Sequence, residues 1–157
     1  MITDPKWDRR FLRLAAEVAS WSKDPSTQVG AVIVNDLRQV VGMGYNGFAR
    51  GVNDDSARYN DRPLKYRMIV HAEQNAIIQA GHAARDGTLY VYPSFGHPNI
   101  CHECAKLAIQ AGIKIVVGYH ADPDHPRAAD WYDSLYLAGQ MFDEAGVYWY
   151  SVEKEAV

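Results

Sequence analysis

Two short segments, His71-Ala72-Glu73 and Cys101-His102-Glu103-Cys104, dominate this sequence of 157 residues. The two cysteines of the second segment are the only ones in the chain. A histidine and a Cys-x-x-Cys pair supply three of the ligands that Zn²⁺ prefers, and the nearby glutamate supplies a proton carrier. A tetrahedral ion with three protein ligands keeps its fourth position for water. The two segments therefore predict a zinc site that is open on one side, with a carboxylate beside it.

The composition is that of an ordinary globular protein, with 48% hydrophobic and 22% charged residues. A chain of this length can bury one sizeable core, so we expect a single domain over residues 1–157. Its formal net charge of −3 disfavours a polynucleotide ligand but permits a small nucleotide. No apolar run approaches the roughly 20 residues that span a bilayer, and the N-terminus has no signal-peptide pattern. We therefore expect a cytoplasmic protein with no membrane partner.

Hydrophobic spacing predicts a helix in the first part of the chain, followed by a β-hairpin. Asp4 and Pro5 suit the N-cap and the first helical position, and the helix is expected to end near Ser22. Residues 29–34 and 39–45 are rich in β-formers and are joined by a turn at 35–36. The next segment, 46–68, is polar and contains two glycines and a proline. We expect it to be a long irregular loop with a functional role.

From residue 71 onward, helical and strand patterns alternate. Helices are predicted to begin at His71 and His102, each ending at a glycine, and a last helix carries the apolar residues of 131–142. Strands are predicted at 88–92, 113–118 and 147–152. A hairpin followed by this alternation predicts an α/β protein with a three-layer α/β/α fold, in which a mixed sheet of about five strands lies between helices.

Both zinc segments fall at predicted helix N-termini, where unpaired backbone N–H groups and the helix dipole favour negative charge. Cys101 and Cys104 are three residues apart, so they lie on one side of the first helical turn, as a shared metal requires. His71 would be the third zinc ligand. Glu73 would stand beside the open position and act as the catalytic general acid and base.

Two other interpretations of the cysteine pair are open. In a reducing compartment such a pair is either a metal clip or a redox pair of the thioredoxin type, although nothing else in the chain is typical of that fold. A closed structural zinc site would need a fourth protein ligand, for which the chain offers four candidates: His97, His102, His120 and His125.

With these residues considered, the chain resembles the deoxycytidylate (dCMP) deaminase family of the cytidine deaminase-like superfamily. The resemblance extends from Trp7 to about Tyr150 and includes segments 21–31 (WSKDPSTQVGA), 44–48 (GYNGF), 65–66 (KY) and 71–77 (HAEQNAI). The His-x-Glu and Cys-x-x-Cys pattern is the signature of zinc deaminases of nucleobases. The resemblance implies the cytidine deaminase-like fold and a Zn²⁺-dependent hydrolase that converts dCMP and water to dUMP and ammonia.

By the same resemblance, four residues are expected to contact the substrate. Asn46 would hydrogen-bond the nucleoside near its sugar, and the backbone N–H of Ala72 would meet the pyrimidine carbonyl. Ser26 and Thr27 would belong to the loop that faces the nucleotide. Plain structural alternatives exist, because Asn46 and the glycine after it are a common turn signal, and the Ser-Thr pair could simply end the first helix.

The resemblance also implies partners beyond the base. Basic residues between 50 and 67 could supply a phosphate fork, but acidic residues interleave with them, so most are expected on a solvated loop face. Family members are commonly homo-oligomers, and some are regulated by dCTP and dTTP. Aromatic residues near the C-terminus are a candidate interface, although such residues are more often core: Trp131, Tyr132, Tyr136 and residues 148–150.

One departure from the family pattern concerns the base. The family has a proline directly before the first metal cysteine, whereas this chain has Ile100, and its connection over 92–100 is several residues longer. This connection borders the base pocket in the family fold. The resemblance therefore supports the deamination reaction more strongly than it supports cytosine as the base. The alternatives are a modified cytosine nucleotide, another free nucleobase or nucleoside, an RNA base, or a non-catalytic nucleotide-binding zinc protein.

Overall fold

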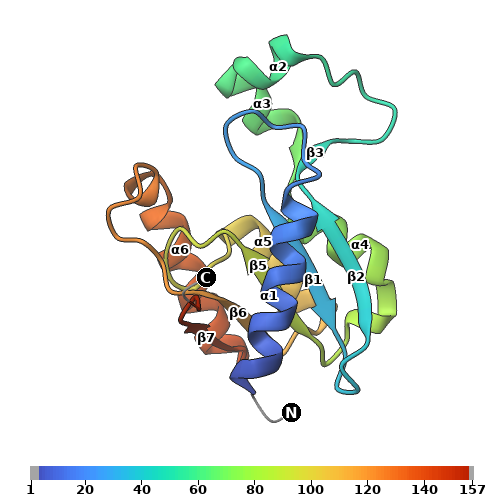
Figure 1. Cartoon of the computed structure of the whole chain (residues 1–157), viewed down its shortest axis with the longest axis vertical. Coiled ribbons are helices and arrows are strands. Elements are labelled where there is room, and N and C mark those ends of the chain that lie inside the picture. The colour runs from blue at the N-terminus through green and yellow to red at the C-terminus, as the bar shows by residue number, and fades with distance from the viewer. Residues whose placement is uncertain (1–3, 156–157) are drawn as a thin grey trace.

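The computed structural model describes residues 4–155, and its centre is a five-stranded sheet (Figure 1). The strands lie in the order β2 (Val40–Tyr45), β1 (Gly30–Val34), β5 (Thr88–Tyr92), β6 (Ile115–Tyr119) and β7 (Tyr148–Val152). β1 runs antiparallel to both β2 and β5, whereas β5, β6 and β7 are parallel. The predicted mixed sheet of about five strands is confirmed.

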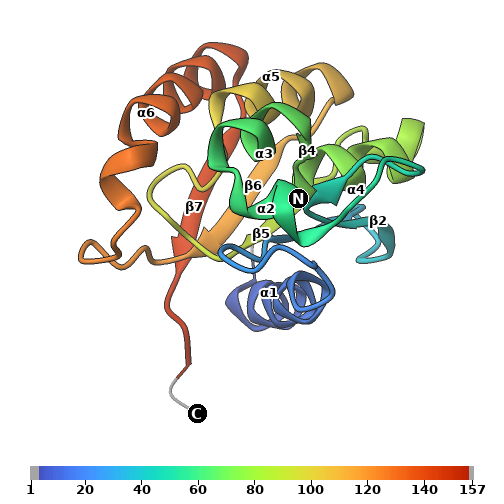
Figure 2. The ribbon, with the colours of Figure 1, turned by 90° about the horizontal axis from the view of Figure 1, so that it is seen from above.

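Helices cover both faces of this sheet (Figure 2). α1 (Pro5–Ala19) lies against one face, and α4 (Ala72–Ala80), α5 (His102–Ala111) and α6 (Ala128–Ala145) lie against the other. Each space between layers holds its own buried cluster, and β1 contributes Val32 to the cluster under α1 and Ile33 to the opposite one. This division follows from the alternation of side chains along a strand. The predicted three-layer α/β/α fold is therefore confirmed.

α1 begins where the sequence predicts but ends earlier. Asp4 caps it by accepting a hydrogen bond from the N–H of Lys6 at 3.0 Å. The helix ends at Ala19 rather than near Ser22, because the N–H groups of Trp21 and Ser22 donate to carbonyls three residues back and tighten the chain into a turn. The Ser22 hydroxyl then donates to the backbone carbonyl of Asn46, directly after β2, at 2.7 Å. This hydrogen bond fixes the turn to the sheet.

The segment 46–68 is ordered into short elements, so the prediction of an irregular loop is wrong. β3 (Gly47–Phe48) pairs antiparallel with β4 (Ile69–Val70), and α2 (Ser56–Asn60) and α3 (Arg62–Met68) lie between them. Asp55 and Asp61 cap these helices by accepting backbone N–H groups three residues on, each at 3.2 Å. Helices this short are hidden from an argument based on hydrophobic periodicity, which needs windows of about 11 residues or more.

The C-terminal half follows the predicted alternation with small shifts in the boundaries. α4 continues into a 3₁₀ turn, η1 (Gly81–Ala84), and β6 begins at Ile115 rather than at 113. Tyr132, Tyr136 and Tyr148 are each more than half exposed, so the core alternative does not apply to them, whereas Trp131 packs partly buried against the core. None of the helices within residues 4–155 is long and apolar enough to cross a membrane.

Candidate metal centre and its pocket

Four potential metal ligands converge where α4 and α5 begin: His71, Glu73, Cys101 and Cys104. The ligand atoms of these residues all lie within 4.8 Å of one another. The Nδ1 atom of His71 is 3.5 Å from Cys101 Sγ and 3.3 Å from Cys104 Sγ. Donors bound to a tetrahedral Zn²⁺ at about 2.0–2.3 Å lie about 3.3–3.8 Å from one another. The histidine and the two cysteines therefore have the chemistry and the spacing that a zinc ion requires.

Three local features shape the start of α4 and hold it against the sheet. His71 is the N-cap, and its N–H donates to the side chain of Gln74 at 2.8 Å. The side-chain amide of Asn75 donates to the carbonyl of Tyr45 in β2 at 2.9 Å. Gly44 has no side chain, and a Cβ atom there would collide with the backbone of α4. The glycine thus lets the helix pack directly on β2, which positions the histidine and the glutamate.

The geometry at the start of α5 shifts the pKa values of the two cysteine thiols. Cys101 is the N-cap, and its Sγ accepts the N–H of Cys104 at 3.4 Å. Hydrogen bonding from Cys104 lowers the pKa of the Cys101 thiol to about 4, and the same contact, together with burial, raises the pKa of Cys104. Both cysteines lie close to the positive end of a helix dipole, which favours the thiolate form that a metal ligand requires.

His71 and Glu73 complete the electrostatics of the site. The hydrogen bond to Cys101 raises the pKa of His71 to about 9. The Glu73 side chain is buried, with the residue only 5% exposed, and this burial raises its pKa. Zinc requires a neutral imidazole and thiolate sulfurs, so metal binding must release protons from this cluster. A carboxyl group whose pKa is raised by burial is suited to general acid–base chemistry.

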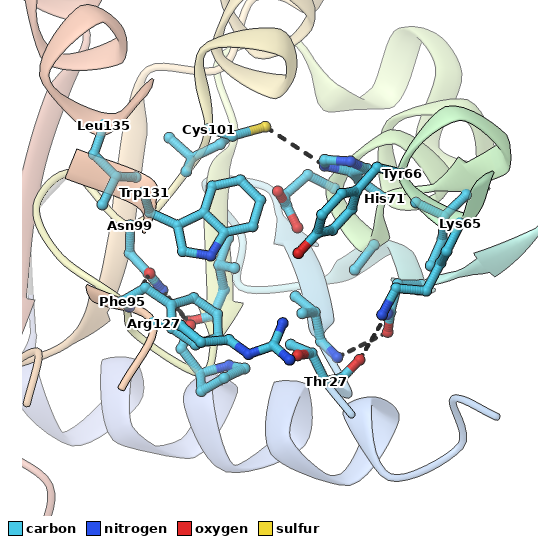
Figure 3. A pocket seen from close by; sticks show the side chains of 18 residues that line it. Thr27, Lys65, Tyr66, His71, Phe95, Asn99, Cys101, Arg127, Trp131 and Leu135 are labelled. Atoms are coloured by element: carbon cyan, nitrogen blue, oxygen red, sulfur yellow. Dashed lines mark hydrogen bonds between the residues drawn. The ribbon is translucent and has the colours of Figure 1, made fainter. Parts of the chain in front are cut away.

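A pocket opens beside the cluster, with a space of about 720 Å³ that includes its open mouth. Figure 3 shows His71 and Cys101 on one side of the pocket and Thr27 and Arg127 on the other. Phe95 and Trp131 both line it, with ring centroids 6.3 Å apart and planes inclined by 28°. The pocket thus combines a metal-binding side, an aromatic wall and a cationic side.

Residues 5–120 match the sequence model of the family described as "Cytidine and deoxycytidylate deaminase zinc-binding region". The chain belongs to this family. It is 40% identical over 144 residues to an uncharacterized deaminase in the luxG 3′ region of Aliivibrio fischeri, with 90% of each chain covered. It is 39% identical over 150 residues to the deoxycytidylate deaminase of Homo sapiens, with 90% of this chain and 77% of the relative covered.

Solved structures share the deaminase fold. The apo form of the dCMP deaminase from cyanophage S-TIM5 has a TM-score of 0.67 at 21% identity, with 96% of this chain and 100% of the other covered. The same enzyme in complex with dCMP and dUMP has a TM-score of 0.64 at 19% identity, with the same coverage. The predicted resemblance to deoxycytidylate deaminases is confirmed by the family match and the relatives.

Three of the four residues expected to contact the substrate line the pocket, namely Thr27, Asn46 and Ala72. Asn46 is buried, its Oδ1 accepts the N–H of Val29 at 2.8 Å, and its Nδ2 donates to the carbonyl of Thr27 at 2.8 Å. The amide therefore joins the loop before β1 to the end of β2. One lone pair of Oδ1 is left for a ligand.

Ser26, the fourth residue, does not line the pocket, but it accepts a hydrogen bond from Lys65, which does. Lys65 comes from α3 and is only 3% exposed. Its Nζ donates to Ser26 Oγ at 2.8 Å and forms an ion pair with Asp24 at 3.2 Å. A solvated loop face was expected for most of the basic residues between 50 and 67, and this lysine is an exception because it pairs with the buried Asp24. The sequence has no local pattern that reveals such a tertiary pair.

The four histidines considered as a fourth zinc ligand lie elsewhere. Within residues 4–155, the group of close ligand atoms contains none of them. His102 Nδ1 is 2.8 Å from the hydroxyl of Ser134 on α6, and the rings of His97 and His125 pack against aromatic side chains. None of these histidines can therefore complete a closed structural site in this arrangement, and Glu73 is the fourth member of the cluster.

Two further pocket residues, Arg127 and Trp131, come from the start of α6 and were not expected at the site. Arg127 is the N-cap residue, and Trp131 follows four positions later. That spacing places both side chains on one face of the helix. Spacing alone does not indicate which layer of the fold that face meets, so the sequence could not predict that these two residues line the pocket.

Proposed function

We propose that this chain is a zinc-dependent hydrolytic deaminase that converts dCMP and water to dUMP and ammonia. The observation that supports the proposal most strongly is the convergence of three zinc donors and a buried carboxylate at the side of a pocket. The family match and the identity to human deoxycytidylate deaminase support the reaction. The dCMP and dUMP bound by the cyanophage enzyme support a nucleotide substrate.

Four residues carry the chemistry in this proposal. His71, Cys101 and Cys104 hold the metal. Bound zinc supplies an activated water as the nucleophile at neutral pH. Glu73 takes the protons of the attacking water, passing one to the ring nitrogen and one to the departing amino group. The water oxygen becomes the new carbonyl oxygen, the carbon–nitrogen bond breaks, and the amino group leaves as ammonia, so atoms and charges balance.

The surrounding residues orient the base and the sugar. Ala72 is the first residue of α4, so its N–H has no acceptor within the helix and can donate to the pyrimidine carbonyl. Asn46 accepts from a sugar hydroxyl through the remaining lone pair of Oδ1. Thr27 faces the nucleotide from the opposite wall. Ser26 acts indirectly, since it fixes Lys65 in the pocket wall.

A second candidate is the same reaction on another base, because the long connection contributes Phe95 and Asn99 to the pocket. Asn99 holds the connection itself: its Nδ2 donates to the carbonyls of Val91 at 3.2 Å and Pro93 at 2.7 Å. Its side-chain oxygen accepts the N–H of Phe95 at 3.0 Å. This leaves the aromatic ring of Phe95 as the feature that would reshape the base site.

A substrate panel on the zinc-loaded protein tests the proposal. We expect dCMP to give dUMP and one equivalent of ammonia, and expect slower conversion of deoxycytidine and of guanine and adenine nucleotides. Turnover of another base in preference to cytosine supports the second candidate. A zinc-replete protein that deaminates none of these compounds contradicts both. Repeating the assay with dCTP or dTTP, and measuring the mass in solution, tests the expected regulation and homo-oligomer.

A further inference from the structure

A lysine and an arginine, Lys65 and Arg127, line the pocket, and only the lysine is paired with a carboxylate. Lys65 faces Asp24, whose two carboxylate oxygens lie 3.2 and 3.3 Å from its Nζ, and it also donates to Ser26. An ammonium group has three donors, so these contacts occupy Lys65, and the carboxylate balances its charge. Lys65 therefore shapes the pocket wall and offers little free positive charge to a ligand.

Arg127 is the second cation of the pocket. Its guanidinium makes no hydrogen bond or ion pair with the residues between 4 and 155, although the side chain is partly buried. Figure 3 shows it extending from the start of α6 toward Thr27, on the side away from His71 and Cys101. Its fork of N–H donors thus faces the pocket without a protein acceptor. A guanidinium in this position matches the oxygens of a phosphate group.

A second unpaired donor is found on the same side of the pocket. The hydroxyl oxygen of Thr27 is buried and has no hydrogen-bond partner in the described part of the chain. Buried polar atoms in folded proteins are nearly always paired, so an unpaired one beside a pocket indicates a ligand contact. A ligand oxygen between Thr27 and Arg127 would satisfy both groups.

The long connection before α5 packs against the turn that carries Arg127. The backbone N–H of Arg127 donates to Nδ1 of His125 at 3.1 Å. The His125 ring packs edge-on against Phe95, with centroids 5.0 Å apart. Phe95 is itself anchored through its N–H to Asn99. The segment that departs from the family pattern therefore supports the position of the arginine.

We propose that Arg127 is a specificity-determining residue that binds the 5′-phosphate of the substrate and selects nucleoside monophosphates over nucleosides. With the base at the metal centre, the sugar lies in the middle of the pocket and the phosphate reaches the side that holds Arg127 and Thr27. The inference rests on the proposed function for the orientation of the substrate. Its test uses binding rather than turnover, so the two proposals can fail separately.

The test compares dUMP with 2′-deoxyuridine, which differ only in the phosphate and have no amino group to lose. Calorimetry on the zinc-loaded protein gives the Kd of each for the wild type, Arg127→Gln and Arg127→Lys. Arg85→Gln is the matched control, because Arg85 is exposed at the end of η1 and does not line the pocket. Thermal denaturation and zinc content of every variant show whether the fold is retained.

A charge-assisted hydrogen bond corresponds to about 10- to 100-fold in affinity. We therefore expect Arg127→Gln to weaken dUMP binding by about that factor and to change 2′-deoxyuridine binding by less than about twofold. Arg127→Lys, which keeps the charge but loses the fork, should give an intermediate loss for dUMP alone, and it serves for the same comparison if the glutamine variant does not fold. Arg85→Gln should bind both compounds as the wild type does.

Three results would overturn the inference. These are a wild type that binds the two compounds equally, an Arg127 variant that weakens both by the same factor, and folded Arg127 variants that change neither. A wild type that prefers dUMP through Arg127 but does not deaminate dCMP supports the phosphate site and contradicts the proposed function.

Discussion

Replacing Gly44 with alanine should push α4 away from β2 and displace the residues that begin this helix. The added Cβ would lie 2.5 Å from the backbone nitrogen of Ala76 and 2.7 Å from the Cβ of Asn75. Non-bonded carbon atoms are best separated by about 3.5–4.0 Å, so the helix must move outward by roughly 1 Å. The backbone on both sides of this contact is part of regular structure, which leaves no flexible group to give way.

The expected loss of stability follows from this overpacking. Insertion of a methyl group into a tight contact costs about 1–3 kcal/mol. For a chain of this size each kcal/mol lowers Tm by about 2–4 °C, so the variant should melt about 2–12 °C below the wild type. Gly47→Ala is the matched control, since its Cβ would meet only the Tyr59 hydroxyl at 3.8 Å. That variant should be unchanged or slightly more stable, because alanine restricts the unfolded chain.

The same displacement should reduce catalysis. His71 and Glu73 sit at the start of α4, and a misplacement of about 1 Å can cost roughly 100-fold in rate. We expect a 10- to 100-fold lower kcat for dCMP in Gly44→Ala, as roughly bounded by that figure, and a wild-type kcat in Gly47→Ala. Differential scanning calorimetry and the dCMP assay measure the two effects. A Gly44→Ala protein with the Tm and kcat of the wild type would refute the argument that direct helix–strand contact positions the site.

Two further predictions concern buried charges. Lys65→Met should lower the free energy of unfolding by about 3–5 kcal/mol, because it leaves Asp24 buried without its cation. Urea denaturation measures this loss. A loss below about 1 kcal/mol, which is typical of exposed ion pairs, would contradict the prediction. Burial raises the pKa of Asp8, so the folded protein holds this proton more tightly than the unfolded chain, and that contribution to stability is lost as pH rises through the folded pKa. The Tm of Asp8→Asn relative to the wild type should therefore increase as the pH is raised above about 4, the ordinary pKa of an aspartate, whereas a constant difference would contradict the raised pKa.

The sequence was sufficient for the fold and for the metal cluster, because both depend on local patterns. Cys101 and Cys104 are one helical turn apart, so their proximity is certain once the helix is predicted. The convergence of His71 with them was expected from the His-x-Glu and Cys-x-x-Cys signature of zinc deaminases, not from spacing along the chain. The short helix α3, in contrast, has a clear capping residue in Asp61 but too few residues to show a periodicity.

The rest of the pocket depends on contacts between distant segments. Lys65 is buried because it meets Asp24, 41 residues earlier in the chain, and nothing near either residue indicates the pairing. Asn46 was expected to contact the sugar, yet most of its hydrogen-bonding capacity holds the loop before β1. Arg127 reaches the pocket from the start of α6, whereas the basic residues that the sequence offers for a phosphate lie between 50 and 67. Such placements follow from tertiary packing and not from motif spacing.

The division of roles within the metal cluster is tested most directly by Glu73→Ala. Zinc content per chain and the rate of dUMP formation are measured on the same preparation, beside the wild type. We expect one zinc per chain in both proteins and loss of turnover in the variant alone, because His71, Cys101 and Cys104 hold the metal while Glu73 moves the protons. Turnover at the wild-type rate in a zinc-replete Glu73→Ala protein would contradict the account.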